Sequence, residues 1–208
     1  MRRFLVSIVS VPLASVSSAS AGFVFEQPPL PGGGIASQEF PNLSSYSCAC
    51  LDDFTLTERI ALGSLRIFGL DDALADPSAN LDVRVGFHVG PDLGSAIAAT
   101  FHGVQVDDDL VFDLGGTFLE AGTYWIAAQV VRPFESGQQW YWQLSDTANG
   151  GQAVFHNPGG GFGFGTVPIP VSGLGSGAQD MAFRLEFVPA PGAWAALALA
   201  GIAAHRRR

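Results

Sequence analysis

The sequence contains no lysine, and all ten of its basic residues are arginines. Five of these arginines lie at the two ends of the chain: Arg2, Arg3, Arg206, Arg207 and Arg208. All nineteen acidic residues lie between Glu26 and Glu186, where only five arginines oppose them, so this central part has a formal charge of −14. Nucleic-acid binding needs a basic surface, and this charge therefore excludes that class of function. The charge permits binding of divalent cations.

Motifs of the common enzyme classes are also missing. The sequence has no H-E-x-x-H zinc motif, no G-x-S-x-G nucleophile motif and no Walker lysine. We therefore expect a protein that is not an enzyme. The spacing of the four histidines is not typical of a zinc triad, and we expect each of them at the surface or capping a turn: His88, His102, His156 and His205.

Cysteine is scarce, with Cys48 and Cys50 as the only two residues. In an exported chain, oxidation to a disulfide is favoured. A bond between cysteines two positions apart would be strained, so two free thiols are the second interpretation. A zinc site is the third, because zinc needs about four ligands and no second cysteine pair is present.

The N-terminus has the three parts of a secretory signal peptide. Met1-Arg2-Arg3 is the positive region, Phe4 to Ala14 is apolar, and Ser15 to Ala21 is rich in small residues. Ala19 and Ala21 form the A-x-A pattern that precedes cleavage. We therefore assign residues 1–21 to a signal peptide and expect an exported protein.

The C-terminus has a Pro/Gly motif, an apolar segment and a basic end. The motif is Val188-Pro189-Ala190-Pro191-Gly192, the apolar segment is 193–204 and begins near Trp194, and the end is Arg206-Arg207-Arg208. As a helix, the apolar segment would span only ~18 Å, against a hydrocarbon core of ~30 Å. The arginines resist translocation, so this end should stay on the cytoplasmic side while the membrane holds the tail.

This order of motif, apolar segment and arginine cluster in residues 188–208 resembles the PEP-CTERM sorting signal of bacterial exported proteins. The acidic residue usual between the two prolines is replaced by Ala190. The resemblance implies recognition by an exosortase-type processing enzyme as a partner. It also implies a final location at the cell surface or in the extracellular matrix.

The body between the two ends is predicted to be all-β. Residues 22–47 are rich in proline and glycine, and we expect an irregular leader there with at most one short strand. Residues 48–187 show short alternating runs bounded by turn residues, which is typical of strands. We predict a single antiparallel β-sandwich, jelly-roll-like, flanked by an N-terminal signal helix and a C-terminal apolar helix. The expected strands are 52–57, 60–69, 81–89, 96–106, 110–114, 122–131, 139–144, 152–156, 166–171 and 180–187.

Three tryptophans are candidates for a glycan-binding platform. Trp140 and Trp142 face the same side of their strand, and Trp125 lies in another strand. Exposed indole rings stack on the C–H faces of sugars, whereas buried rings fill a sandwich core, and core packing is the commoner outcome. The sequence leaves both interpretations open, and exposure of the rings distinguishes them.

Acidic loops are candidates for a structural calcium site. Asp107-Asp108-Asp109 form one such loop, and Asp71, Asp72 and Asp76 lie in another. Carboxylate oxygens are calcium ligands, but aspartate is also frequent in ordinary turns. No other cofactor is expected. The glycine-rich run 158–165 is predicted to be a flexible loop.

The leading hypothesis is an exported surface or matrix protein that acts by interaction, with extracellular polysaccharide as a candidate partner. The first alternative is a carbohydrate-binding module that uses the tryptophans. The second is a secreted sandwich-fold glycoside hydrolase, which requires two carboxylates across a groove.

Overall fold

The structure is a computed structural model, and it describes residues 24–72, 80–97, 100–134, 138–147, 149–178 and 180–188. The predicted signal peptide, the predicted sorting signal from Pro189 onward and the two predicted flanking helices lie outside the described residues. Within the described ranges, no helix is long and apolar enough to cross a membrane.

The described chain is all-β, as predicted, and its strands form three sheets. Pairing is antiparallel throughout, except that β3 runs parallel to β12. The first sheet has the order β1 (Val24–Gln27), β17 (Phe183–Val188), β5 (Ile60–Ile67), β10 (Asp109–Asp113) and β9 (Val104–Val106), with β11 (Phe118–Leu119) also on β5.

The second sheet carries the longest strand of the molecule at its centre. Its order is β15 (Ile169–Pro170), β14 (Val154–His156), β4 (Ala49–Leu56), β12 (Gly122–Val131), β7 (Asp82–His88) and β8 (Phe101–His102), with β3 (Gln38–Glu39) also on β12. The third sheet is small and consists of β16 (Asp180–Met181), β13 (Trp140–Ser145) and β2 (Gly34–Ala36), with β6 (Gly69–Asp71) also on β13.

The predicted strand positions are confirmed along most of the body, and their inward faces follow the alternation in the sequence. In β7, for example, Val83, Val85 and Phe87 are buried while Arg84 is partly exposed. This agreement reflects the two-residue period of a strand, which places every second side chain on the same face.

The prediction of an irregular leader at residues 22–47 is wrong. Residues 24–39 of that stretch contain β1, β2 and β3, each in a different sheet. These strands are only two to four residues long. Each is defined by its partner strand, because such short segments have no periodicity of their own.

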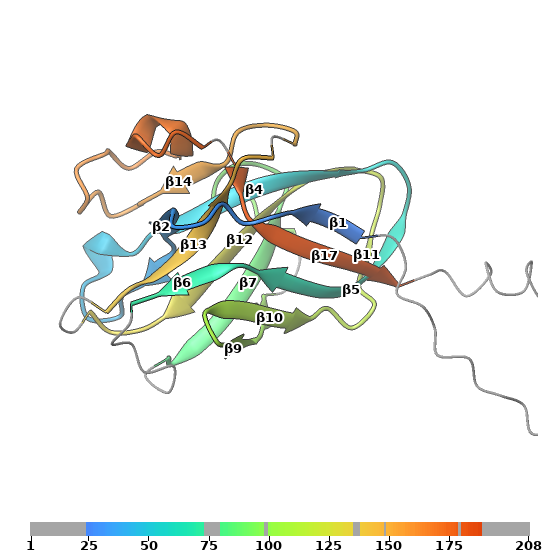
Figure 1. Cartoon of the computed structure of the whole chain (residues 1–208), viewed down its shortest axis with the longest axis horizontal. Coiled ribbons are helices and arrows are strands. Elements are labelled where there is room, and N and C mark those ends of the chain that lie inside the picture. The colour runs from blue at the N-terminus through green and yellow to red at the C-terminus, as the bar shows by residue number, and fades with distance from the viewer. Residues whose placement is uncertain are drawn as a thin grey trace, which may run out of the picture.

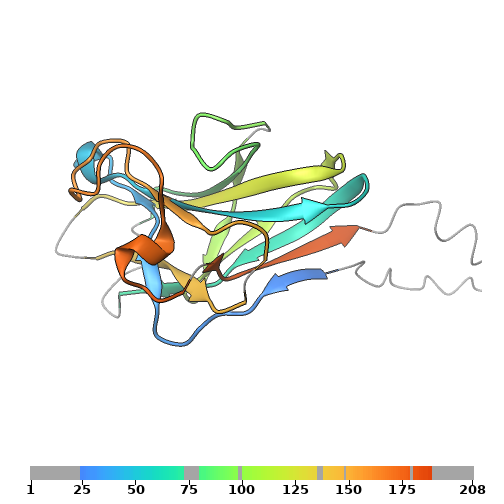
Figure 2. The same ribbon diagram turned by 90° about the horizontal axis from the view of Figure 1, so that it is seen from above.

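The two larger sheets lie over one another as two layers, with the core between them (Figure 2). Aromatic rings from both layers meet there: the Phe25 ring of β1 lies 6.2 Å from Phe54 of β4, and the Phe54 ring lies 6.1 Å from Phe87 of β7. The layered, all-β arrangement is consistent with a β-sandwich.

The sandwich has two distinct ends. β1 begins and β17 ends at the same end, where Val24 pairs with Glu186 (Figure 1). We call this the terminal end. The short 3-10 helix η1 (Ser44–Tyr46) and the glycine-rich loop 158–165 lie at the opposite end, on the left of Figure 1. We call that the distal end.

Candidate functional site

Trp140 and Trp142 are core residues, so the prediction of a glycan platform is wrong for them. Both side chains are fully buried. Trp140 Nε1 donates to the Asp108 carbonyl at 2.7 Å, and Trp142 Nε1 donates to the Ala182 carbonyl at 2.7 Å. The rings fill the sandwich and satisfy their single donors internally. Trp125 is half-buried on the outer face of the second sheet, where it packs against a small apolar cluster of Ala49, Leu51, Ala127 and Val154.

The aspartates of the predicted calcium loop form the turn between β9 and β10. Asp107 has φ 56°, a left-handed conformation that a tight hairpin turn requires. The Asp109 carboxylate accepts hydrogen bonds from Gly69 N and from Arg66 Nη1, both at 3.0 Å. Within the described ranges, no three His, Cys, Asp or Glu side chains are grouped so that they could hold a metal ion. Asp76 lies outside those ranges.

Cys48 and Cys50 are two free, buried thiols, so the disulfide prediction is wrong. Residues two positions apart along an extended strand have Cα atoms about 6.6 Å apart, near the upper limit of disulfide geometry. Cys48 Sγ instead donates to the Ala36 carbonyl at 3.2 Å. Burial raises the pKa of the Cys48 thiol to about 12, so the reactive thiolate is suppressed.

The histidines are dispersed over the fold. His102 Nδ1 lies 2.8 Å from Asp82 Oδ1 at the surface, and His156 Nε2 lies 3.3 Å from the Thr166 carbonyl. His88 is buried, so the expectation of a surface or capping residue is wrong there. His205 lies outside the described residues.

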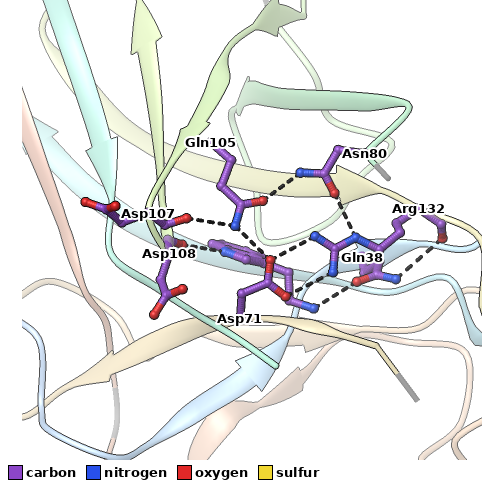
Figure 3. Close-up of polar contacts among 8 residues, drawn as sticks. Gln38, Asp71, Asn80, Gln105, Asp107, Asp108 and Arg132 are labelled. Carbon is purple, nitrogen blue, oxygen red and sulfur yellow. Dashed lines mark hydrogen bonds and ion pairs between the residues drawn. The ribbon is translucent and has the colours of Figure 1, made fainter. Parts of the chain in front are cut away.

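The most extensive polar cluster surrounds Arg132, which is 1% exposed (Figure 3). Its guanidinium makes a bidentate ion pair with Asp71, with bonds of 2.9 and 2.8 Å, and Nε donates to Asn80 Oδ1 at 2.8 Å. Asn80 Nδ2 donates to Gln105 Oε1 at 2.6 Å, and Gln105 Nε2 donates to Asp71 Oδ2 at 2.7 Å. The four side chains therefore close a ring in which the charges of Arg132 and Asp71 balance.

Gln38 extends this Arg132 cluster to the distal end. Its Nε2 donates to the Arg132 carbonyl at 3.4 Å, and its Oε1 accepts from Trp140 N at 2.9 Å. Three side chains of the distal end lie within two residues of this cluster along the chain: Phe40 follows Gln38, Phe134 follows Arg132, and Gln139 precedes Trp140. The cluster thus fixes the backbone from which those side chains project.

A cavity of about 380 Å³ opens at the distal end and is lined by Phe40, Leu43, Tyr46, Phe134, Gln139 and Phe162. We call it the distal pocket. Phe40 and Phe134 form one edge-to-face pair with ring centroids 5.5 Å apart, and Tyr46 and Phe162 form another at 5.2 Å. Tyr46 is 36% and Phe134 39% exposed, so these rings present apolar surface to solvent.

The glycine-rich loop 158–165 forms one wall of the pocket, and the prediction of a flexible loop does not describe how it is held. Asn157 donates to the carbonyls of Ser45 and Ser47 at 2.9 and 2.8 Å, and its Oδ1 accepts from Phe162 N at 3.1 Å. A Cβ at Gly159 would lie 2.5 Å from Ser45 Cα. Glycine is therefore required for the loop to dock on η1 and to hold Phe162 over the pocket.

Among the described residues, no charged side chain lines the distal pocket, although the surrounding body is strongly acidic. The polar side-chain groups of its lining residues are the Gln139 amide and the Tyr46 hydroxyl. Pockets that bind small ligands are usually apolar with a few convergent polar groups, and most exceed about 300 Å³. The geometry therefore suits a neutral group with an apolar face.

The distal pocket was not found from the sequence. The sequence predicts an irregular leader around Phe40 and a flexible loop around Phe162, and it predicts no element at Phe134, which lies between the expected strands 122–131 and 139–144. A usable signal was present in Asn157, which precedes Pro158 and the glycine run, because asparagine commonly fixes such turns through its side chain.

No protein-family model matches this chain, and no characterised protein matches it in sequence.

Proposed function

We propose that this chain is an exported protein that is attached to the cell surface by its C-terminal end and acts by binding a partner at the distal pocket. The observation that carries the proposal is the arrangement of the two ends. The chain enters through β1 and leaves through β17 at the terminal end, and η1 and the glycine-rich loop lie at the opposite end (Figure 1). Both of these segments contribute lining residues to the distal pocket. A protein held by its tail would thereby direct the pocket away from the membrane.

The body would be a jelly-roll-like sandwich carried by the sorting signal. Two features support this finer assignment. The chain crosses at Gly103 from β8 in the second sheet to β9 in the first sheet. A Cβ at Gly103 would lie 2.5 Å from the Val111 carbonyl. β17 ends at Val188, the first residue of the sorting motif, so the motif follows the last strand directly. An exosortase-type enzyme would then be the processing partner, at the cell envelope.

Extracellular polysaccharide is the partner class that the pocket chemistry favours. Half-exposed Tyr46 and Phe134 rings offer flat apolar surface to the C–H faces of a sugar. The Gln139 amide supplies both a donor and an acceptor for hydroxyl groups. The uncharged lining favours a neutral sugar unit.

Fractionation of cells tests the export part of the proposal. The full chain should be found in the envelope or outside the cell, and a chain lacking its last twenty residues should be released. A full chain that stays soluble in the cytoplasm would contradict the proposal.

A glycan array tests the binding part, with the purified full chain in detergent and in the presence or absence of calcium. Phe134→Ala should lower the signal about tenfold, because it removes one wall of the pocket. The matched control is Phe118→Ala at β11, an exposed ring that Arg59 covers at 4.3 Å, away from the pocket. Equal signals for the two variants would remove the pocket from the proposal.

Glycoside hydrolysis is a second candidate, favoured by one observation. Asp146 and Asp180 line the same cavity of about 210 Å³. Asp146 is exposed and Asp180 is 2% exposed, and burial raises the pKa of Asp180. One exposed and one buried carboxyl group in the same cavity suit the roles of base and acid in one reaction. Release of reducing ends from polysaccharides that is lost in both Asp146→Asn and Asp180→Asn would establish it; no release by the unaltered chain would exclude it.

A further inference from the structure

Three carboxyl groups are buried near the loop that follows β13. Asp52 and Asp53 are 0% and 3% exposed on β4, and Asp180 is 2% exposed on β16. Asp52 shares the core face of β4 with Phe54 and Leu56, an unusual place for an ionisable group. None of the ion pairs among the described residues involves these three aspartates.

Backbone N–H groups are their main partners. Asp52 Oδ2 accepts from Met181 N and from Gln27 Nε2, both at 2.7 Å, and Asp52 Oδ1 accepts from Asp53 N at 2.8 Å. The other two carboxylates hold the loop. Asp53 Oδ1 accepts from Gly151 N and Asp180 Oδ2 accepts from Asn149 N, both at 2.8 Å.

Residues 149–151 cover the carboxylates of Asp53 and Asp180. Gly150 has φ +77°, and a Cβ there would lie 2.4 Å from Asp53 Oδ2. A Cβ at Gly151 would lie 3.8 Å from the Trp125 ring. The glycines therefore let the backbone close directly over Asp53, and the same backbone shields one edge of Trp125.

Burial is the largest cause and raises the pKa of each of the three aspartates. Hydrogen bonds from backbone N–H groups lower each pKa by less, and repulsion from Asp180 raises the pKa of Asp52 and Asp53 further. The unfolded value is about 3.9. The folded chain therefore holds protons that the unfolded chain has lost. The stabilisation is complete below the unfolded pKa and is lost as the pH rises through the folded values.

An ionised carboxyl group that is buried becomes more stable when water reaches it, because the loss of hydration is the main free-energy cost of its burial. β4 is fixed in the sheet by β12 and β14. Residues 149–151 pair with no strand, and their described hydrogen bonds run from Asn149 N to Asp180 and from Gly151 N to Asp53. Ala153 is anchored instead, because its side chain is fully buried and its carbonyl accepts from Val171 N. Residues 149–151 can therefore leave without unzipping a sheet.

We propose that residues 149–151 form a strap that is closed over Asp53 and Asp180 in acid and opens as the pH rises. Among the described residues, the carboxyl groups that bond it are Asp53 from β4 and Asp180 from β16. Asp52 lies behind them on the core face of β4, and the exposed Asp146 precedes the segment in the chain. Cys50 lies on the core face of β4 with Asp52, where burial, and then Cys48 and Asp52, raise the pKa of its thiol, so it stays neutral. Opening exposes Asp53, Asp180 and the Trp125 ring.

Trp125 reports on the strap. Acrylamide quenching of tryptophan fluorescence would be measured from pH 4 to pH 8 in the full chain with Trp194→Phe, since Trp140 and Trp142 are fully buried. The quenching constant should rise roughly twofold or more with pH, as expected for a locally opening segment. Addition of Trp125→Phe should abolish that rise.

Asp53→Asn combined with Asp180→Asn should keep the strap closed and the profile flat, because each amide oxygen can still accept its N–H. Asp113→Asn, at an exposed carboxylate on β10, is the matched control and should leave the rise unchanged. Gly150→Ala should raise quenching at every pH, because the added methyl group cannot fit beside Asp53. It also tests the strap independently if the double variant does not fold.

A quenching constant that does not change with pH in the chain with an unaltered strap would overturn the proposal. A rise in that constant that persists in the double Asn variant would overturn it too. So would an unchanged profile in Gly150→Ala. The proposal does not depend on the function proposed for the distal pocket.

Discussion

Arg132 and the three aspartates of the strap site are all buried, but their surroundings differ in charge balance. Arg132 and Asp71 neutralise one another, and Asn80, Gln105 and Gln38 occupy their remaining groups. At the strap site, three acidic groups gather without an ion pair among the described residues, and Gln27 Oε1 lacks a partner there. The Arg132 cluster holds a fixed geometry, whereas the free-energy cost of burying the three aspartates depends on pH.

This difference has a consequence for each of the two regions. The balanced cluster lies behind the distal pocket, where aromatic side chains must keep their positions to present a binding surface. The unbalanced group lies under a short loop that can move without breaking a sheet. Burial alone therefore does not predict rigidity; the pairing of the buried charges does.

Breaking the balance of the Arg132 cluster should have the largest effect. Arg132→Met leaves Asp71 buried and unpaired, which should cost about 3–5 kcal/mol of unfolding free energy. Urea unfolding at pH 7 measures it. In the double variant with Asp71→Leu the loss should be much smaller, because both charges are removed; equal losses would show that packing of the Arg132 stem matters more than its charge.

Removing a carboxylate charge at the strap site should raise the free energy of unfolding at neutral pH, whereas the loss of Arg132 lowers it. Asp180→Asn should lose less stability between pH 4 and pH 7 than the unaltered chain, because the raised pKa of Asp180 makes its ionisation unfavourable to folding. The difference between the two urea midpoints, followed across this range, measures the effect. A difference that does not change with pH would contradict it.

Docking of the glycine-rich loop should matter to a smaller degree. Gly159→Ala should cost about 1–3 kcal/mol and weaken any binding at the distal pocket, because the methyl group would displace the loop from Ser45. Gly173→Ala is the control, since nothing lies within 4 Å of its added Cβ. Thermal unfolding of the two variants compares them, and an equal shift would argue against the docked loop.

Breaking an exposed ion pair should have the smallest effect on the free energy of unfolding, in contrast to the loss of the buried Arg132. Arg66 bonds Asp109 at 3.0 Å, but its side chain is 47% exposed. Arg66→Ala should therefore cost less than about 1 kcal/mol. Urea unfolding at low and high salt tests this, and a loss as large as that of Arg132→Met would refute the role given to burial.

The strands were predictable because alternation is a local property. Phe54 and Leu56, or Val83 and Val85, reveal their inward side within a few residues of sequence. The distal pocket was not predictable, since Phe40, Phe134 and Phe162 meet only after three sheets have formed. Trp140 and Trp142 show an intermediate case: the sequence placed both on one face of a strand, and only the second layer showed that this face is the core.

The sequence by itself determined an acidic all-β body, the positions of most strands and the inward face of each. Only the tertiary structure decided which buried charges have partners. Arg132 meets Asp71 across 61 residues, whereas the neighbours Asp52 and Asp53 meet Asp180 and no cation among the described residues. The reason is physical: side-chain alternation follows from the backbone of one strand, but a charge pair depends on the order and register of strands that are distant in the chain.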